Sequence, residues 1–259
     1  MPTESPASPD DWNAHWENYA DSAVQNPAQR MRHDFIARLL SATAAGEEVR
    51  ILDLGSGQGD LLEKLSQLFP EASLLGTELS EKGVAISRQK VPRATFIVAD
   101  IFHPPPAQAA YLSWATHGVC SEVLEHVDDP ISLLQQARKY LAPGASLIVT
   151  VPGGPMSAFD RHIGHRRHFD RQSIRRILEQ AGYSVERVYA TGFPFFNLYR
   201  LFVIAGGKQL ERTVEAQSRG ISAAVANRLM RAFRFLFYGN FRDSRFGWQF
   251  VAVARKNSL

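Results

Sequence analysis

Apolar positions along the chain fall into two alternating patterns. Short continuous apolar runs, typical of buried strands, occupy 49–54, 73–76, 95–98, 116–120, 145–151, 184–189 and 248–254. Between most of them apolar residues recur every three or four positions, which predicts helices over 28–44, 60–69, 81–90, 130–141 and 169–181. This alternation predicts an α/β fold in which a parallel sheet carries helices on both faces. Ligands of such sheets bind at the carboxyl ends of the strands.

Two further helical stretches interrupt the alternation at 193–246, between the last two predicted strands. In the second stretch Phe233 and Phe237 belong to an apolar side, and Arg228, Arg231 and Arg234 form a neighbouring basic stripe. The pattern is typical of a helix that packs on the sheet as a cap. It is also found in basic amphipathic helices that lie in a membrane interface.

The chain therefore divides into four predicted parts. These are an N-terminal extension (1–27), a core (28–192), an aromatic and basic helical cap (193–246) and a final core strand (247–259). In the extension, Trp12, Trp16 and Tyr19 follow a stretch rich in Pro, Ser and acidic residues. We interpret these aromatic residues either as a lid or as simple packing residues.

Composition narrows the class of protein. The net charge of +3 is too small to indicate DNA binding, although residues 193–245 hold nine Lys/Arg against three Asp/Glu. The single cysteine, Cys120, excludes an internal disulfide and a zinc-ribbon site. Because the sequence also shows no signal-peptide pattern and no long apolar run, we expect a cytoplasmic protein, with peripheral membrane contact as an alternative.

Three glycines, Gly55, Gly57 and Gly59, lie between the first predicted strand and the helix that follows it. Glycines at such a turn let a ligand approach the backbone closely. The G-x-G-x-G spacing differs from the dinucleotide-binding G-x-G-x-x-G pattern and from a phosphate-binding loop. Asp53, just before the loop, would repel a pyrophosphate. It would instead favour a cationic ligand.

Two more acidic residues follow the next two strands. Glu78, at the end of the second strand, can accept hydrogen bonds from both hydroxyls of a ribose. Asp100, after the third strand, can accept one from the exocyclic amine of adenine. Together with Asp53 and the loop, these residues predict a site for an adenosine compound that carries a positive charge.

These motifs resemble those of class I S-adenosylmethionine-dependent methyltransferases. The resemblance covers about 28–192 and rests on 51–59, Glu78, Ala99-Asp100 and the stretch 121–127. It implies a Rossmann-like seven-stranded sheet, mostly parallel with the last strand antiparallel. It also implies that S-adenosyl-L-methionine is the cofactor. The residues that it assigns to cofactor binding are Arg32, Asp53, Gly55, Ser56, Gly57, Gly59, Glu78, Leu79, Asp100, Ile101, Ser121 and Glu122.

Acidic residues and histidines cluster after the fourth strand. Glu122, Glu125 and His126 stand at positions i, i+3 and i+4, so one helical turn would place all three on the same face. His165 and His168 follow in a later loop. Such a dense group of titratable side chains at a sheet edge predicts catalytic or metal-binding chemistry.

Two hypotheses account for this cluster. In the first, Glu122, Glu125, His126 and His165 bind a divalent cation such as Mg²⁺. This arrangement resembles the E-x-x-E-H motif of ubiquinone-pathway O-methyltransferases and small-RNA 2′-O-methyltransferases. In the second, the motif is one that is common in metal-free methyltransferases, and His126, His165 or His168 is the general base.

The function expected from the sequence is methyl transfer to a small-molecule acceptor, most simply to oxygen. Aromatic residues of the cap favour an apolar or aromatic acceptor. Arg161, Arg166 and Arg167 either bind an anionic group of that acceptor or support their own loop. The alternatives are a non-catalytic cofactor-binding or membrane-peripheral module and an RNA methyltransferase.

Overall fold

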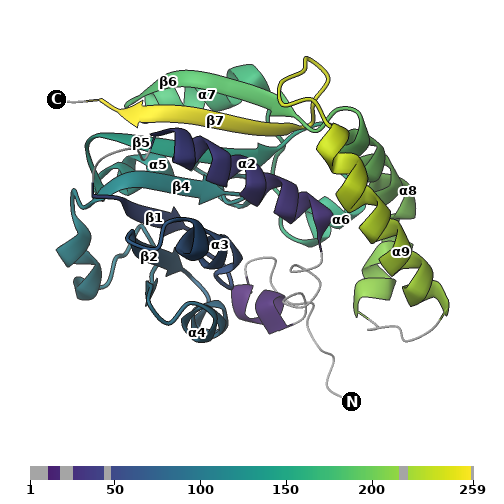
Figure 1. Cartoon of the computed structure of the whole chain (residues 1–259), viewed down its shortest axis with the longest axis horizontal. Coiled ribbons are helices and arrows are strands. Elements are labelled where there is room, and N and C mark those ends of the chain that lie inside the picture. Colours follow the sequence, from purple (N-terminus) through teal and green to yellow (C-terminus); the bar gives the residue numbers. More distant parts are fainter. Residues whose placement is uncertain (1–10, 18–25, 44–47, 216–220, 258–259) are drawn as a thin grey trace.

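The computed structural model describes residues 11–17, 26–43, 48–215 and 221–257, and its centre is one seven-stranded sheet (Figure 1). The strands follow the order β3-β2-β1-β4-β5-β7-β6, and β7 runs antiparallel to both of its neighbours while the other pairs are parallel. The strands are β1 (Arg50–Leu54), β2 (Ser73–Glu78), β3 (Thr95–Val98), β4 (Ala115–Ser121), β5 (Leu141–Pro152), β6 (Tyr183–Thr191) and β7 (Gln249–Lys256). The predicted mostly parallel sheet with an antiparallel last strand is confirmed.

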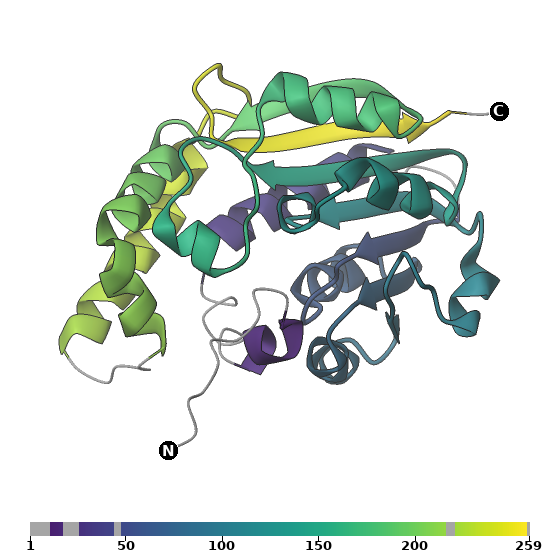
Figure 2. The ribbon, with the colours of Figure 1, turned by 180° about the vertical axis from the view of Figure 1, so that it is seen from behind.

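Helices cover both faces of the sheet, as the alternating pattern predicts. The helices of the core are α2 (Pro27–Thr43), α3 (Asp60–Leu68), α4 (Glu81–Lys90), α5 (Pro130–Arg138), α6 (Ala158–His162) and α7 (Arg171–Gln180). Short 3-10 turns occur at η1 (Pro106–Tyr111), η2 (Leu124–His126) and η3 (Phe237–Gly239). Apolar residues of α2, α3 and α4 pack on one face, and those of α5 and α7 pack on the other (Figures 1 and 2).

Local sequence explains where several of these helices begin. Asp129 caps α5 by accepting hydrogen bonds from the Ile131 and Ser132 amides, and Pro130 fits the first turn because it needs no such partner. Asp170 and Ser173 form a reciprocal capping box at the start of α7. The element boundaries predicted from the sequence at 139–144 were wrong, because α5 ends at Arg138 and not at Leu141. β5 begins at Leu141 rather than at 145 because Leu141 pairs with Ala115 of β4.

The cap consists of two helices, α8 (Phe195–Glu215) and α9 (Ile221–Leu236), inserted between β6 and β7. Phe196, Phe233 and Phe237 join Ala28 of α2 in a separate apolar cluster, so α9 does pack against α2 and α8 (Figure 1). The predicted helical insertion is confirmed. In the described part of the chain, no helix has both the length and the apolar character needed to cross a bilayer.

Candidate functional site

The glycine loop follows β1 at the carboxyl end of the sheet, and its backbone requires glycine. Gly55, Gly57 and Gly59 all have positive φ angles of 71°, 54° and 82°. A Cβ atom on Gly55 would lie 2.5 Å from Cγ2 of Val123, and one on Gly57 would lie 2.5 Å from the Trp16 ring. The loop is therefore in direct contact with the segment after β4 and with a short N-terminal helix over residues 12–17.

Glu78, at the end of β2, is buried beside this loop. Its carboxylate accepts hydrogen bonds from the Gly57 amide (2.9 Å) and the Ser80 amide (3.0 Å). Burial raises the pKa of Glu78, and these backbone donors oppose the rise. The structure thus brings together the loop and the acid that the sequence assigned to one ligand.

Asp53 lies at the end of β1, between the glycine loop and β4. Burial raises the pKa of Asp53 to about 8, and the negative charge of Glu78 contributes to the rise. Two neighbouring carboxyl groups that resist ionisation together create a strong local preference for a positive charge. This supports the prediction that the ligand is cationic.

The proposed adenine end of the site is more open. Asp100 is half exposed, and its carboxylate already accepts hydrogen bonds from the Phe102 amide (2.9 Å) and from His103 Nδ1 (2.8 Å). Ile101 is partly buried, whereas Leu79 is exposed beside Glu78. Exposed Leu79 and half-exposed Asp100 form a surface that suits a flat ring beside buried Glu78. The roles of these residues in binding adenine stay predictions.

The helix over residues 12–17 lies across the loop. The Trp16 ring packs against Gly57 and Gly83. Asn13 Oδ1 accepts hydrogen bonds from Ser80 Oγ (2.7 Å) and the Lys82 amide (3.2 Å). Trp12 approaches His126 edge-on, with 4.8 Å between the ring centroids. This position fits both the lid interpretation and the packing interpretation, and the choice between them stays open.

Tyr19, the third aromatic residue of the predicted lid, lies outside the described residues.

Glu122 departs from the expected helical turn. It has a positive φ of 57°, and only Leu124–His126 form the 3-10 turn η2. Its Oε1 accepts hydrogen bonds from Thr150 Oγ1 (3.0 Å) and Gln249 Nε2 (2.9 Å), and its Oε2 lies 3.6 Å from Arg32 Nη1. The prediction that Glu122, Glu125 and His126 share one helical face is therefore wrong, because Glu122 has a left-handed backbone and lies outside the turn.

Ser121, just before this reversal, is held beside the same group. Its Oγ lies 2.8 Å from Thr150 Oγ1, which in turn donates to Glu122. Arg32 comes from α2 and its side chain is largely buried. Arg32, Ser121 and Glu122 thus form one polar network at the carboxyl ends of β4 and β5.

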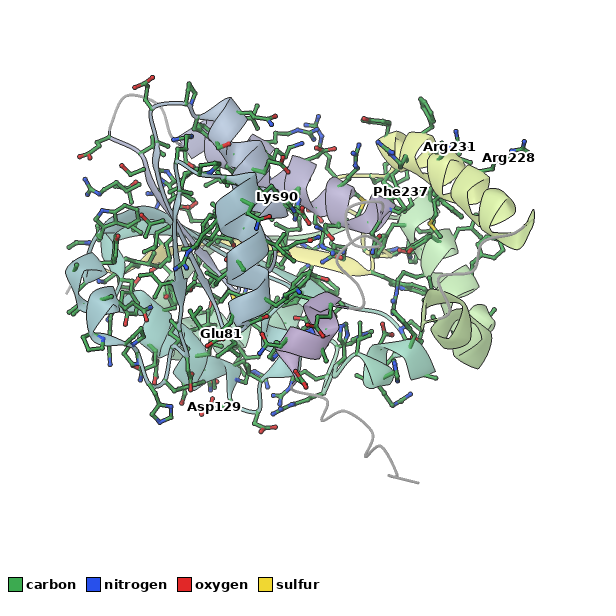
Figure 3. All side chains as sticks on the ribbon, turned by 90° about the horizontal axis from the view of Figure 1, so that it is seen from below. Glu81, Lys90, Asp129, Arg228, Arg231 and Phe237 are labelled. Atoms are coloured by element: carbon green, nitrogen blue, oxygen red, sulfur yellow. The ribbon has the colours of Figure 1, made fainter. Side chains whose placement is uncertain are left out.

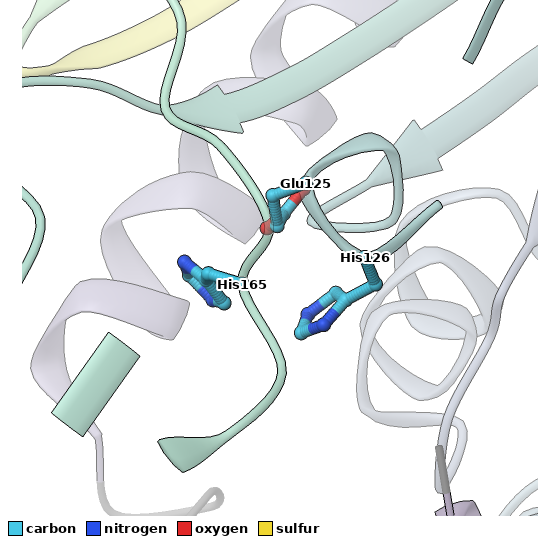
Figure 4. Close-up of side chains that lie close together, drawn as sticks. All are labelled: Glu125, His126 and His165. Carbon is cyan, nitrogen blue, oxygen red and sulfur yellow. The ribbon is translucent and has the colours of Figure 1, made fainter. Parts of the chain in front are cut away.

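Glu125, His126 and His165 form the second part of the predicted cluster (Figure 4). One ligand atom from each lies within 4.8 Å of the other two. Glu125 is fully buried, and neither of its carboxylate oxygens has a hydrogen-bond partner in the described part of the chain. Burial and the nearby charge of Glu122 raise the pKa of Glu125. Of the four residues of the predicted metal set, these three lie together, whereas Glu122 is engaged elsewhere, and metal binding stays a prediction.

The histidines continue from this group towards α6. The rings of His126 and His165 lie 4.8 Å apart, and His165 Nδ1 lies 3.3 Å from His168 Nε2. Burial lowers the pKa of His165 to about 3, with a further contribution from His126, so its ring is neutral at pH 7. His168 Nδ1 lies 3.0 Å from the carbonyl oxygen of Gly154.

Sequence reasoning missed the ion pair behind these histidines. Asp160 of α6 accepts hydrogen bonds from Arg200 Nη1 (2.9 Å) and Nη2 (2.6 Å) of α8. Burial alone would raise the pKa of Asp160, but Arg200 and Ser157 lower it to about 2. His168 Nε2 lies 3.7 Å from the same carboxylate. The S-x-x-D spacing of Ser157 and Asp160 was the available signal, since it predicts a capped helix there.

Arg166 and Arg167 hold in place the loop after α6 that carries His165 and His168, here called the histidine loop. Arg166 forms an ion pair with Asp128, and Arg167 donates to the Asp128 carbonyl oxygen (2.9 Å). Arg161 is exposed and makes only a long 3.4 Å hydrogen bond to the Ser157 carbonyl oxygen. Within the described residues, neither Arg161 nor Arg167 forms an ion pair with an acid, and Arg161 is the more exposed of the two.

Known proteins with similar sequences are methyltransferases. The trans-aconitate 2-methyltransferase of Variovorax paradoxus is 34% identical over 144 residues, which is 55% of this chain and 50% of that protein. The enzyme of the same name from Methylobacterium nodulans is 32% identical over 143 residues, 55% of this chain and 50% of that protein. The matched stretch thus spans half the length of these relatives.

Solved structures share the fold at low sequence identity. Phosphoethanolamine N-methyltransferase 2 of Haemonchus contortus, in complex with S-adenosyl-L-methionine, has a TM-score of 0.56 at 14% identity, covering 86% of this chain and 52% of that one. A geranyl diphosphate methyltransferase has a TM-score of 0.58 at 14% identity, covering 88% of this chain and 78% of that one. The sheet and its flanking helices are therefore those of methyltransferases with a Rossmann-like fold.

The model of the methyltransferase domain family matches residues 25–188, from the start of α2 through most of β6. The match includes the glycine loop, Glu78, Asp100 and the segment after β4, where the structure places the candidate site. The chain belongs to the methyltransferase domain family.

Proposed function

We propose that the chain is an S-adenosylmethionine-dependent methyltransferase that methylates an oxygen atom of a small-molecule acceptor. The observation that supports this most is the contact between two parts of the site. Val123 packs against Gly55, and the helix over 12–17 contacts both Gly57 and His126. A ligand held at the loop therefore lies beside titratable side chains, and such positioning supplies much of the rate of an in-line transfer.

S-adenosylmethionine supplies an electrophilic methyl group when it is bound. In our proposal Glu78 accepts hydrogen bonds from the ribose hydroxyls, and the glycine backbone leaves room for the methionine part. Ser56 fits this role, because its buried Oγ has no hydrogen-bond partner in the described part of the chain. The complete proposed set is Arg32, Asp53, Gly55, Ser56, Gly57, Gly59, Glu78, Leu79, Asp100, Ile101, Ser121 and Glu122.

His126 is the proposed general base. His165 is a weak base, because burial lowers its pKa to about 3. His168 is engaged through one ring nitrogen with the Gly154 carbonyl oxygen and through the other with His165. His126 lies at the meeting point of the N-terminal helix and His165. It would accept the proton of an acceptor hydroxyl, whereas a carboxylate acceptor is already ionised at pH 7 and needs no base.

The acceptor that we propose is a small anionic molecule. The relatives named trans-aconitate 2-methyltransferases support a carboxylic acid as the first compound to test. Arg161, which is exposed at the histidine loop, is the proposed partner of its negative charge. An apolar or aromatic part of the acceptor would contact the cap, and the cytoplasmic location stays a prediction based on the single cysteine.

A divalent cation is the second hypothesis for the acid–histidine cluster. It is favoured by one observation, the buried and unpartnered carboxylate of Glu125 beside two imidazoles. One oxygen and two nitrogen donors suit Mn²⁺ or Zn²⁺ better than Mg²⁺, which prefers oxygen. Glu122 does not fit this set, because its carboxylate faces Thr150, Gln249 and Arg32.

The decisive experiment separates cofactor binding from turnover. His126→Ala should lower kcat for methylation of an acceptor hydroxyl by about 10²- to 10⁴-fold, the range of general-base catalysis. Methylation of a carboxylate such as trans-aconitate, which is ionised at pH 7 and needs no base, should fall much less. The affinity of this variant for S-adenosylmethionine, measured by calorimetry, should stay within a few-fold of the parent value. His162→Ala, at the exposed end of α6 just before the loop, is the matched control and should keep full activity.

The same assay tests the other hypotheses. Treatment with a chelator should leave turnover unchanged, and a loss that Mn²⁺ or Zn²⁺ restores would replace the metal-free mechanism by the second hypothesis. Cofactor binding without turnover on any acid would favour a non-catalytic module. Methylation of RNA, with a steep dependence on salt, would favour the RNA methyltransferase alternative.

A further inference from the structure

A basic and aromatic groove lies on the face formed by α2, α3 and α9, away from the acid–histidine cluster. Its volume is about 750 Å³, and its lining includes Arg30 and Arg38 of α2 together with Arg234, Tyr238 and Arg242 of the cap. The function proposed above assigns no role to these residues. Their chemistry combines positive charge with a large ring.

The four arginines of this groove are not engaged by the protein. Within the described part of the chain, the guanidinium groups of Arg30, Arg38, Arg234 and Arg242 take part in no ion pair or hydrogen bond. Arginines elsewhere in the protein usually form such contacts. Arg93, for example, donates hydrogen bonds to three carbonyl oxygens. Four unengaged guanidinium groups around one groove form an anion-binding surface.

Acidic residues of the same groove do not cancel this charge. Asp34 forms an ion pair with Lys64, and Asp60 forms one with Lys90. Glu63 is the third acid of the lining. Because lysines already pair with Asp34 and Asp60, the charge of the four arginines is opposed mainly by Glu63, and the groove keeps a net positive charge.

The outer side of α9 adds exposed rings to this charge. Arg228, Arg231, Phe235 and Tyr238 are spaced so that they fall on one side of the helix and its 3-10 extension. Phe235 is 79% exposed and Tyr238 is 83% exposed. Arg228 and Arg231 point away from the body of the molecule, whereas Phe237 is buried between the helices (Figure 3).

We propose that the α2–α9 face docks onto the anionic surface of a lipid bilayer. Arginines would bind lipid phosphates, and the rings of Phe235 and Tyr238 would enter the headgroup region. Exposed apolar residues favour lipid over RNA: of the thirteen large apolar side chains most exposed in the described residues, eight lie between 193 and 246. A purely electrostatic partner would not need them.

The test is sedimentation of the full chain with vesicles. Protein should sediment with vesicles of phosphatidylcholine and phosphatidylglycerol, and much less with phosphatidylcholine alone. Each neutralised arginine should weaken partitioning about fivefold, so Arg234→Gln with Arg242→Gln should weaken it about 25-fold. Phe235→Ser with Tyr238→Ser should weaken it at every salt concentration, because ring insertion is not screened.

The control is Arg176→Gln, which removes one positive charge from exposed Arg176 on α7, across the sheet, and is compared with the single variant Arg234→Gln. It should sediment like the parent protein. Circular dichroism and S-adenosylmethionine binding should be unchanged in all variants, since none of these residues belongs to the proposed active site. Equal sedimentation of the Arg234/Arg242 variant and the parent would overturn the proposal. So would binding of RNA but not of anionic vesicles.

Discussion

At the scale of single residues, the most informative feature is the pair of acids beside the glycine loop, Asp53 and Glu78. Asp53 and Glu78 lie at the carboxyl ends of adjacent parallel strands and are both buried, and the charge of Glu78 makes ionisation of Asp53 less favourable. A cation placed between them would reverse that effect. The charge preference of the site therefore arises from the desolvation of two carboxyl groups.

This arrangement predicts that cofactor affinity depends on pH. The pKa of Asp53 is about 8 without ligand, and a bound sulfonium or ammonium group would lower it. At a pH between the pKa values of the free and the bound protein, binding therefore releases a proton from Asp53. Affinity for S-adenosylmethionine should rise from pH 6 to pH 8, by at most tenfold per unit, and level off above pH 8. Calorimetry across this range would measure the slope.

Asp53→Asn should flatten this dependence, because the titrating group is gone. Asp100→Asn serves as the comparison, since Asp100 is half exposed and bound by its neighbours. It should weaken binding while keeping the pH slope. A slope that survives in Asp53→Asn would exclude Asp53 as its source.

At the scale of helices and strands, the N-terminal helix and the cap both complete the site from outside the core. The helix over 12–17 covers the loop through Trp16, and α8 reaches α6 through Arg200. Neither element belongs to the alternating pattern of strands and helices. The enclosure of the site is thus an addition to the sheet, consistent with the four-part division of the chain that we propose.

Trp16→Ala should weaken S-adenosylmethionine binding by about tenfold, because removing the ring opens the loop to solvent and loses a buried aromatic contact. Glu17→Ala is the control from the same helix. Its ion pair with Lys82 is exposed, and such pairs contribute little. Equal affinity of both variants and the parent would argue against a lid.

Removal of Arg200 should destabilise the protein at neutral pH. Arg200→Met leaves Asp160 buried without its charge partner, which should lower the free energy of unfolding by about 3 kcal/mol. The folded pKa of Asp160 is depressed to about 2, so its contribution is present above its unfolded pKa near 4 and lost as the pH falls through 2.

Urea unfolding at pH 7 and near pH 2 would measure this effect. The difference between Arg200→Met and the parent should shrink at the lower pH. Adding Asp160→Asn to Arg200→Met should recover part of the loss at pH 7, because the unpaired charge is removed. A constant difference at both values of pH would mean that Arg200 stabilises the cap by packing alone.

At the scale of the whole molecule, the proposed ligand connects the N-terminal helix, the ends of β1 and β2 and the segment after β4. A ligand that binds only the folded state at 100 times its Kd adds about 2.7 kcal/mol of stability. For a chain of this size, S-adenosylmethionine should raise Tm by about 5–10 °C. Thermal unfolding followed by circular dichroism would show it, and Gly57→Ala should abolish the shift.

The sequence by itself determined most of the strands and helices and the position of the glycine loop. Periodicity and glycine spacing act within a few residues, so the loop at 55–59 and the acids Glu78 and Asp100 could be assigned to strand ends without knowing which strands are neighbours. The insertion of two cap helices was visible for the same reason. These features depend on local patterns that survive any rearrangement of the rest of the fold.

Tertiary structure decided what the local patterns left open. Glu122 adopts a left-handed backbone and turns towards Thr150 and Gln249, so it leaves the predicted metal set. Asp160 meets Arg200 from forty residues away, and α2 meets α9 to form the basic groove. Such contacts arise because sheet order and helix packing bring distant residues together, and no spacing along the chain encodes them.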